Sequence, residues 1–149
     1  MKKKFLFIKI IFVYALIAFS VNAKESLYLE KGIDLFNKKE FDKSKVLFER
    51  DLVFDPKSEK SYLYLAKIFN KKDNDAEEEI NLNNVLILNP QNEEAIYLLA
   101  LLKIKQSDYK MARDLIDRFN LVCKDFCFKK NEVEEKLQKL IPENAEKKN

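Results

Sequence analysis

The tripeptide Phe54-Asp55-Pro56 returns later in the chain as Leu88-Asn89-Pro90, with the two prolines 34 residues apart. Similarity at one fixed spacing in this range is typical of a chain built from repeated structural units. Because proline cannot continue a helix, each tripeptide also predicts a helix end. Extending the period in both directions divides the chain into three units, 25–58, 59–92 and 93–126.

Corresponding positions of the three units carry side chains of similar size. The eighth position is always small, whereas the fourth and twenty-fourth are always large and apolar. These positions hold Gly32, Ala66 and Ala100; Tyr28, Tyr62 and Ile96; and Phe48, Leu82 and Ile116. Small side chains where helices cross closely, with large ones filling the space between them, predict packed helix hairpins. Lys31, Asp51 and Glu78 depart from the pattern of their columns.

Local signals agree with paired helices. Apolar residues within the units recur with a helical period rather than in alternation. Asp75 followed by Glu78 has the spacing of a capping box, which predicts that Asp75 is the N-cap of the second helix of the middle unit.

In its period, its small eighth position and its terminal prolines, the sequence resembles the tetratricopeptide-repeat (TPR) family over residues 25–126. The resemblance implies an all-α fold, a right-handed α-solenoid of three helix hairpins within residues 24–126. A generic helical bundle with hairpins of this length is the alternative. The residues expected to set the packing of the repeats are Gly32, Ala66, Ala100, Ala112, Pro56 and Pro90.

The chain continues beyond the third unit with Val133, Leu137 and Leu140 at helical spacing. This predicts a capping helix over 127–142, since a solenoid needs an end that packs inward and is polar outward. The polar stretch 143–149 predicts a disordered tail.

The family binds partners on a concave surface formed mainly by the first helix of each hairpin. The resemblance therefore implies a partner-binding groove for a peptide or helix of another polypeptide. Its expected residues are Lys60, Leu63, Lys67, Asn70, Lys71, Tyr97, Leu101, Ile104 and Lys105. The lysines favour an acidic, partly apolar partner. The alternative is that the apolar members belong to the core and that the lysines are only solvated.

Some family members bind a C-terminal carboxylate with lysines and asparagines of these helices. Here Leu29 and Ile33 stand where the first unit would need polar groups. We therefore do not transfer that function.

The N-terminal residues match a secretory signal peptide over 1–23. Lys2, Lys3, Lys4 and Lys9 accompany an apolar stretch at 5–19, and Val21 and Ala23 suit a signal peptidase. Cleavage after Ala23 predicts a periplasmic protein that meets the membrane only through the signal segment. The alternative is an uncleaved inner-membrane anchor, although the stretch of 15 residues is shorter than the roughly 20 that a span needs.

The composition excludes several classes of function. The segment 1–23 holds four lysines and no acidic residue, so without it the formal charge falls from +3 to −1, which does not favour nucleic-acid binding. No histidine and a single glycine exclude imidazole chemistry and glycine-rich phosphate loops. The acidic run 73–79 lacks the glycine of a calcium loop. We expect no catalytic site, metal, cofactor or small-molecule substrate; an enzyme using carboxylates and a self-associating structural subunit are the alternatives.

Cys123 and Cys127 are the only cysteines, and they lie between the last repeat and the predicted capping helix. In an exported protein such a pair usually forms a disulfide. A metal site would need further ligands, and a redox motif usually has two intervening residues rather than three.

Overall fold

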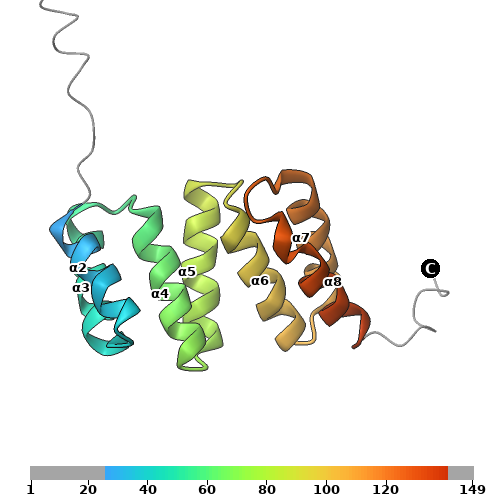
Figure 1. Ribbon diagram of the computed structural model, residues 1–149, viewed down its shortest axis with the longest axis horizontal. Helices are drawn as coiled ribbons and strands as arrows, with labels where there is room; N and C mark the ends of the chain where they lie inside the picture. The colour runs from blue at the N-terminus through green and yellow to red at the C-terminus, as the bar shows by residue number, and fades with distance from the viewer. Residues whose placement is uncertain (1–25, 141–149) are drawn as a thin grey trace, which may run out of the picture.

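The computed structural model describes residues 26–140 as a row of helices (Figure 1). The predicted signal peptide, the disordered tail and the last two residues of the predicted capping helix lie outside these described residues. The helices are α2 (Leu27–Asn37), α3 (Phe41–Phe54), α4 (Glu59–Lys71), α5 (Asp75–Leu88), α6 (Glu93–Lys105), α7 (Tyr109–Val122), the short 3-10 helix η1 (Cys127–Lys129) and α8 (Lys130–Gln138). Within 26–140 no helix is long and apolar enough to cross a membrane.

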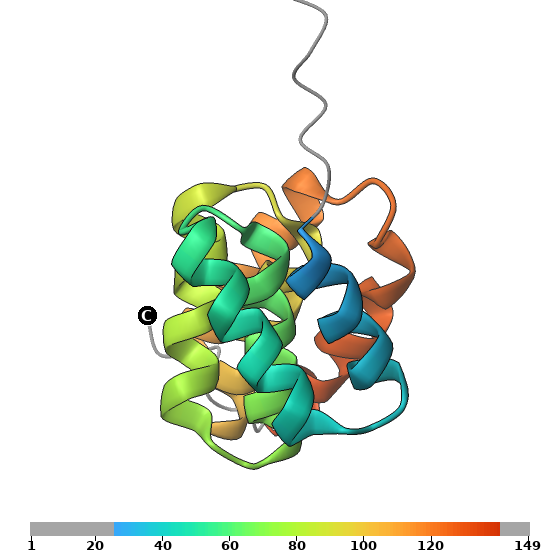
Figure 2. The same cartoon turned by 90° about the vertical axis from the view of Figure 1, so that its left-hand side faces the viewer.

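The helices form three antiparallel hairpins, α2–α3, α4–α5 and α6–α7, which stack side by side (Figures 1 and 2). Helices α3, α5 and α7 begin at Phe41, Asp75 and Tyr109, at intervals of 34 residues. Helix α8 then packs against α6 and α7. The predicted all-α solenoid of helix hairpins is confirmed. Pro56 and Pro90 each stand two residues beyond a helix end, as their inability to continue a helix requires.

Polar side chains at the helix starts satisfy backbone N–H groups that lack an intrahelical partner. Ser26, Asn74, Asn92 and Asp108 each accept a hydrogen bond from a backbone N–H in the first turn. The capping-box prediction for α5 was wrong by one residue. Asn74 is the N-cap, and Glu78 is turned into the protein interior, where its carboxylate accepts hydrogen bonds from Asn70.

The small eighth positions lie where the two helices of a hairpin meet. A Cβ placed on Gly32 would come within 2.7 Å of Cε1 of Phe48, so this site leaves no room for a side chain. Ala66 and Ala100, at the same position of their units, are buried. Ala112 of α7, at the twentieth position of the third unit, is buried as well. The close approach of the paired helices therefore depends on these side chains being small.

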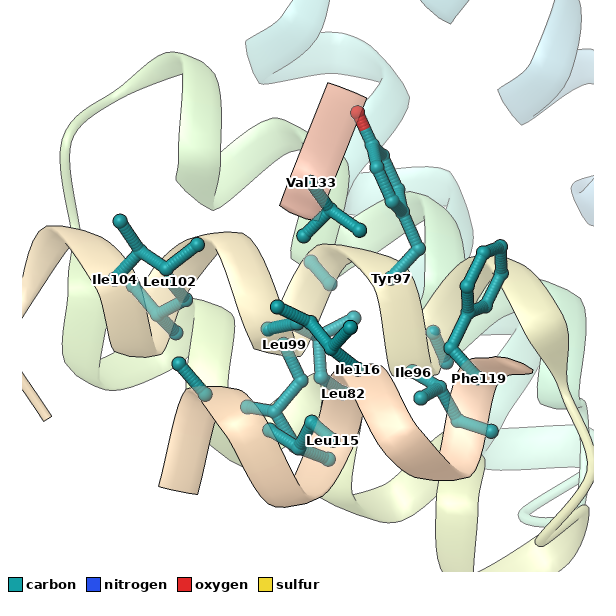
Figure 3. Close-up of a cluster of buried hydrophobic side chains, with 14 of the residues drawn as sticks. Leu82, Ile96, Tyr97, Leu99, Leu102, Ile104, Leu115, Ile116, Phe119 and Val133 are labelled. Atoms are coloured by element: carbon teal, nitrogen blue, oxygen red, sulfur yellow. The ribbon is translucent and has the colours of Figure 1, made fainter. Parts of the chain in front are cut away.

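Two buried clusters form the core. The larger joins the second and third hairpins to α8, with Ile96 and Leu99 of α6 facing Ile116 and Phe119 of α7 (Figure 3). The smaller joins the first hairpin to α4 through Leu29, Phe48, Leu65 and Ile68. Each hairpin thus buries apolar surface against the next, and this is the main source of solenoid stability.

Asp51, which departs from the apolar pattern, ties the first hairpin to the second. Its buried carboxylate accepts hydrogen bonds from Ser26 and, at 2.6 Å, from Ser61. Burial opposes ionisation of Asp51, but the hydrogen bonds from Ser26, Ser58 and Ser61 outweigh it and lower the pKa. Asp51 therefore forms a polar contact between α3 and α4 where the repeat pattern would place an apolar residue.

Candidate partner-binding surface

The predicted groove residues all lie on α4 and α6, the first helices of the second and third hairpins. An ion pair joins the two helices, with Nζ of Lys67 2.7 Å from a carboxylate oxygen of Glu94. The ammonium group of Lys67 also lies 4.9 Å from the ring centre of Tyr64. A groove lysine should be open to a partner, but only 21% of the Lys67 side chain is exposed. Its charge holds neighbouring hairpins together and is not simply presented to a partner.

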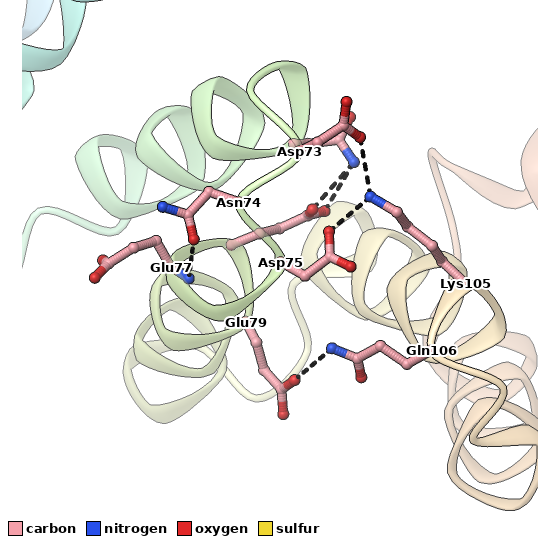
Figure 4. A network of polar contacts seen from close by, with 9 residues as sticks. Asp73, Asn74, Asp75, Glu77, Glu79, Lys105 and Gln106 are labelled. Carbon is pink, nitrogen blue, oxygen red and sulfur yellow. Dashed lines mark hydrogen bonds and ion pairs between the residues drawn. The ribbon is translucent and has the colours of Figure 1, made fainter.

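Lys105 is also paired within the protein. Its Nζ lies 3.0 Å from Asp73 and 2.7 Å from Asp75, at the turn of the neighbouring hairpin (Figure 4). Hydrogen bonds with Asp75 and Asp73 raise the pKa of Lys105 to about 12. Sequence reasoning missed these partners because the acidic run is 30 residues away along the chain. The positive charge of Lys105, which was expected to attract an acidic partner, is therefore neutralised within the protein.

The remaining polar members of the predicted set differ in their surroundings. Lys60 and Lys71 are exposed on α4. Asn70 is also exposed, but its Nδ2 lies 3.1 Å from both carboxylate oxygens of Glu78. Within residues 26–140 Lys71 makes no ion pair, so its charge is the one most directly available on α4.

The apolar members are mostly part of the core. Leu63, Tyr97 and Ile104 are buried, whereas Leu101 is half-buried. The expectation that all four line an open surface is wrong for the first three, because neighbouring helices cover them. Tyr97 shows the cause most clearly, since its hydroxyl donates a hydrogen bond to Glu132 of α8 at 2.8 Å.

Helix α8 is fixed to the third hairpin by a mixed contact. Val133 and Leu137 are buried in the core, while Glu132 accepts hydrogen bonds from Lys129, Lys136 and Tyr97. These bonds lower the pKa of Glu132 to about 2. The side of α6 that carries Tyr97 is therefore closed by the chain itself.

The two cysteines lie in the connection between α7 and α8. Their Sγ atoms are 2.14 Å apart, so the predicted pair is at bonding distance. Within this loop the backbone N–H groups of Lys124 and Phe126 donate hydrogen bonds to Glu93 at 2.8 Å each. The ring of Phe126 also lies edge-on to Tyr97, at 5.6 Å between centres. The role of Glu93 in holding the loop was not predicted, since no local motif signals it.

Known proteins were compared with the chain by sequence and by structure. No family model and no curated protein matches the sequence. The first TPR domain of Spaghetti (RPAP3), bound to the HSP90 peptide SRMEEVD, superposes with a TM-score of 0.69 at 19% identity, over 82% of this chain and 98% of that one. This chain has the TPR fold.

Two further TPR-like structures agree. The Sgt2 TPR domain from Aspergillus fumigatus gives a TM-score of 0.63 at 15% identity, covering 75% of this chain and 78% of that chain. A chain of the CopN–Scc3 complex gives 0.63 at 13% identity, covering 76% and 67%. At such low identity the similarity establishes the fold alone.

Proposed function

We propose that this protein is a non-catalytic interaction scaffold that is exported to the bacterial periplasm and binds a segment of another polypeptide. The observation that carries the proposal is the TPR fold, in which stacked hairpins present successive first helices side by side. Among the similar structures, the Spaghetti domain is bound to a peptide and CopN–Scc3 is a complex. The sequence pattern of residues 1–23 supports export.

The contacts within the solenoid narrow the proposed binding surface. Because Lys67 and Lys105 already have carboxylate partners, they hold the helices in place more than they attract a ligand. Lys71 of α4, together with the half-buried Leu101 of α6, remains as a contact for a partner with acidic and apolar side chains. We also propose that the protein contacts the membrane only through residues 1–23, before they are cleaved. If these residues are retained, they would anchor the protein in the inner membrane.

Capture of the partner with the exported protein, followed by Lys71→Glu, tests this function. We expect Lys71→Glu to weaken partner binding about 2-fold to 10-fold, the range for losing and reversing one exposed charge contact. The loss should shrink at high salt, since ions screen exposed charges over about 8 Å at physiological ionic strength. Calorimetry at two salt concentrations measures both effects. N-terminal sequencing of the same preparation tests export, with Lys24 as the expected first residue.

The matched control is Lys110→Glu, which reverses an exposed lysine on α7. It should leave binding unchanged, because α7 is a second helix of a hairpin. Equal binding by wild type and Lys71→Glu would place the contact on another face of the solenoid. Lys67→Glu would be a poor test of binding, because it would set two carboxylates against each other at Glu94 and disturb the packing of the hairpins.

A further inference from the structure

Helix α8 is held by a smaller contact than the helices before it. Two of its nine residues are buried, Val133 and Leu137, whereas seven of the 13 residues of α6 are buried. Asn120 of α7 donates a hydrogen bond to Glu134 of α8 at 2.8 Å, but its buried Oδ1 has no hydrogen-bond partner in the part of the chain that the structure describes. Because little apolar surface is buried and a polar atom is left unpaired, α8 should separate from the third hairpin before the hairpins separate from one another.

Helix α8 and the loop before it cover Tyr97 of α6, which is 5% exposed. The hydroxyl of Tyr97 donates a hydrogen bond to Glu132 at 2.8 Å, and Val133 lies next to its ring (Figure 3). Phe126 packs edge-on against the same ring, at 5.6 Å between centres. Tyr97 stands four residues before Leu101, so the two share one side of α6. Departure of α8 would therefore extend the proposed binding surface by a large aromatic side chain.

The loop before α8 is closed by a disulfide and bound to α6 by a carboxylate. Cys123 directly follows α7, and its disulfide partner Cys127 begins η1. Between them, the backbone N–H groups of Lys124 and Phe126 donate hydrogen bonds to Glu93 at 2.8 Å each. Because both donors lie inside the closed loop, the disulfide limits how far they can turn away from Glu93. The disulfide therefore also keeps α8 close to its position on the third hairpin.

The disulfide can be reached by a reductant, since Cys127 is exposed and Cys123 is half-buried. A thiolate of a dithiol attacks Sγ of Cys127, the bond between the two cysteine sulfurs breaks, and Cys123 leaves as a thiolate that takes up a proton. The second thiolate of the dithiol then attacks the reductant sulfur that is bound to Cys127. This forms the disulfide of the reductant, and Cys127 leaves as a thiolate and is protonated as well. One dithiol is oxidised, and the two cysteines are reduced to thiols.

We infer that residues 123–138 form a redox-controlled strap, in which reduction of the Cys123–Cys127 disulfide by a dithiol releases α8 and uncovers the Tyr97 side of α6 for the partner. In the oxidised protein the closed loop holds α8 on the third hairpin. After reduction the loop gains conformational freedom that only the released strap can use, so release becomes more frequent. This inference rests on the proposed function, because the partner is the same polypeptide with acidic and apolar side chains.

Helix α8 itself indicates what the uncovered surface binds. It places Val133 and Leu137 four residues apart on one helix face, and Glu132, directly before Val133, accepts the hydrogen bond from Tyr97. A partner helix with two apolar side chains at this spacing and a carboxylate in the place of Glu132 can make the same contacts. This matches the acidic and apolar character already proposed for the partner.

Hydrogen exchange of the whole protein tests the strap without a partner. The backbone amides of 130–138 are followed in the oxidised protein and after reduction with dithiothreitol. We expect exchange there to become about 10-fold faster, the order of the loop-closure entropy for so short a loop, while exchange in α2 and α3 stays unchanged. Cys123→Ser combined with Cys127→Ser should show the faster exchange with and without dithiothreitol. Equal exchange in both redox states, or an equal increase in every helix, overturns the proposal.

A substitution that keeps the disulfide tests the part played by the loop. Glu93→Gln weakens the acceptor of the two loop N–H groups and should speed the exchange of 130–138 in the oxidised protein. Glu59→Gln is the matched control, since Glu59 begins α4 as Glu93 begins α6, but it accepts hydrogen bonds from Asn89 and Asn92 instead. It should leave the exchange of 130–138 unchanged. An equal effect of the two substitutions would contradict the holding of the strap by Glu93.

Calorimetry with the captured partner tests the uncovered surface. The double serine variant should bind the partner about 10-fold more tightly than the oxidised wild type, because apparent affinity follows the population of the state that can bind. Faster exchange of 130–138 without tighter binding would overturn the role of the Tyr97 side of α6. Lys71→Glu should weaken binding in both redox states and leave the exchange of 130–138 unchanged. The strap and the proposed function therefore fail separately, the first in the exchange of α8 and the second in partner binding.

Discussion

At the scale of single residues, Glu78 is a carboxylate in a place where the other units have Ser44 and Ala112. It is buried, and burial raises the pKa of its carboxyl above the ordinary 4.5, although the hydrogen bonds from Asn70 oppose this. Between 4.5 and the raised value, the folded state holds more protons than the unfolded state. The contribution of Glu78 to stability therefore falls as the pH rises through that window.

We expect Glu78→Gln to stabilise the protein at pH 7, by on the order of 1 kcal/mol, because the neutral amide avoids burying a charge and can still accept a hydrogen bond from Asn70. The gain should be smaller at pH 4.5. Thermal unfolding of variant and wild type at the two pH values measures it. A variant that is less stable at pH 7 would show that the ionised carboxylate is needed there.

The neighbouring Glu79 provides a control of opposite sign. Its hydrogen bond with Lys103 lowers its pKa, so its contribution is present above the ordinary 4.5 and is lost as the pH falls through the lowered value. Glu79→Gln should therefore destabilise at pH 7, by roughly 1 kcal/mol or less, since the pair is partly exposed.

At the scale of elements, the three hairpin turns share a strained backbone position. Lys39, Asp73 and Ser107 have φ values of 61°, 52° and 63°, in the left-handed region that favours glycine. They recur at the period of the repeat. The same turn is therefore made three times by residues for which its backbone conformation is unfavourable.

Ser107→Gly should stabilise the protein by up to about 1 kcal/mol, because relief of the left-handed conformation exceeds the entropy cost of glycine. Ser107 is preferred to Asp73, which also pairs with Lys105. Ser107→Val is the control and should destabilise, since a β-branched residue fits this region worst. Denaturant unfolding compares the three proteins. Equal stability of the Gly and Val variants would mean that the turn relaxes to another conformation.

At the scale of the whole molecule, the first hairpin is the outermost one within residues 26–140, and its outer face is polar. Leu65 and Leu99 are buried against the preceding hairpin, whereas Lys31 at the equivalent position of α2 is exposed. The next contact position repeats the contrast, with Ile68 and Leu102 buried and Asp34 exposed. The departure of Lys31 from the repeat pattern thus marks the end of the stack.

Lys31→Leu combined with Asp34→Ile should make the protein self-associate, because each buried side chain of this size contributes about 1.5–3 kcal/mol. The wild type should not associate through this face. Light scattering over a range of concentrations measures the difference. Lys110→Leu combined with Asp114→Ile makes the same exchange on the exposed side of α7 and should associate less. Association of the wild type through α2 would instead support a self-associating structural subunit.

The repeat alone was enough to predict the hairpins, because the constraint behind it is local. Residues such as Ala66 and Ala100 must be small wherever two helices of one hairpin cross, so the requirement returns at every period and can be seen in the sequence. The cysteine pair was predictable for a similar reason, since its partners are four residues apart. Export, cleavage after Ala23 and the identity of the partner stay predictions.

The binding surface could not be predicted in the same way, because it depends on contacts between units. Their positions in the repeat assigned Lys67, Tyr97 and Lys105 to an open groove. In the folded chain Lys67 meets Glu94, Tyr97 meets Glu132 of α8, and Lys105 meets Asp73, and only the packing of the helices brings these partners together. The sequence by itself determined the fold class and the helix positions, since these follow from local size and periodicity. The tertiary structure decided which side chains stay available, because charge pairing and burial depend on neighbours that are about 30 residues away along the chain.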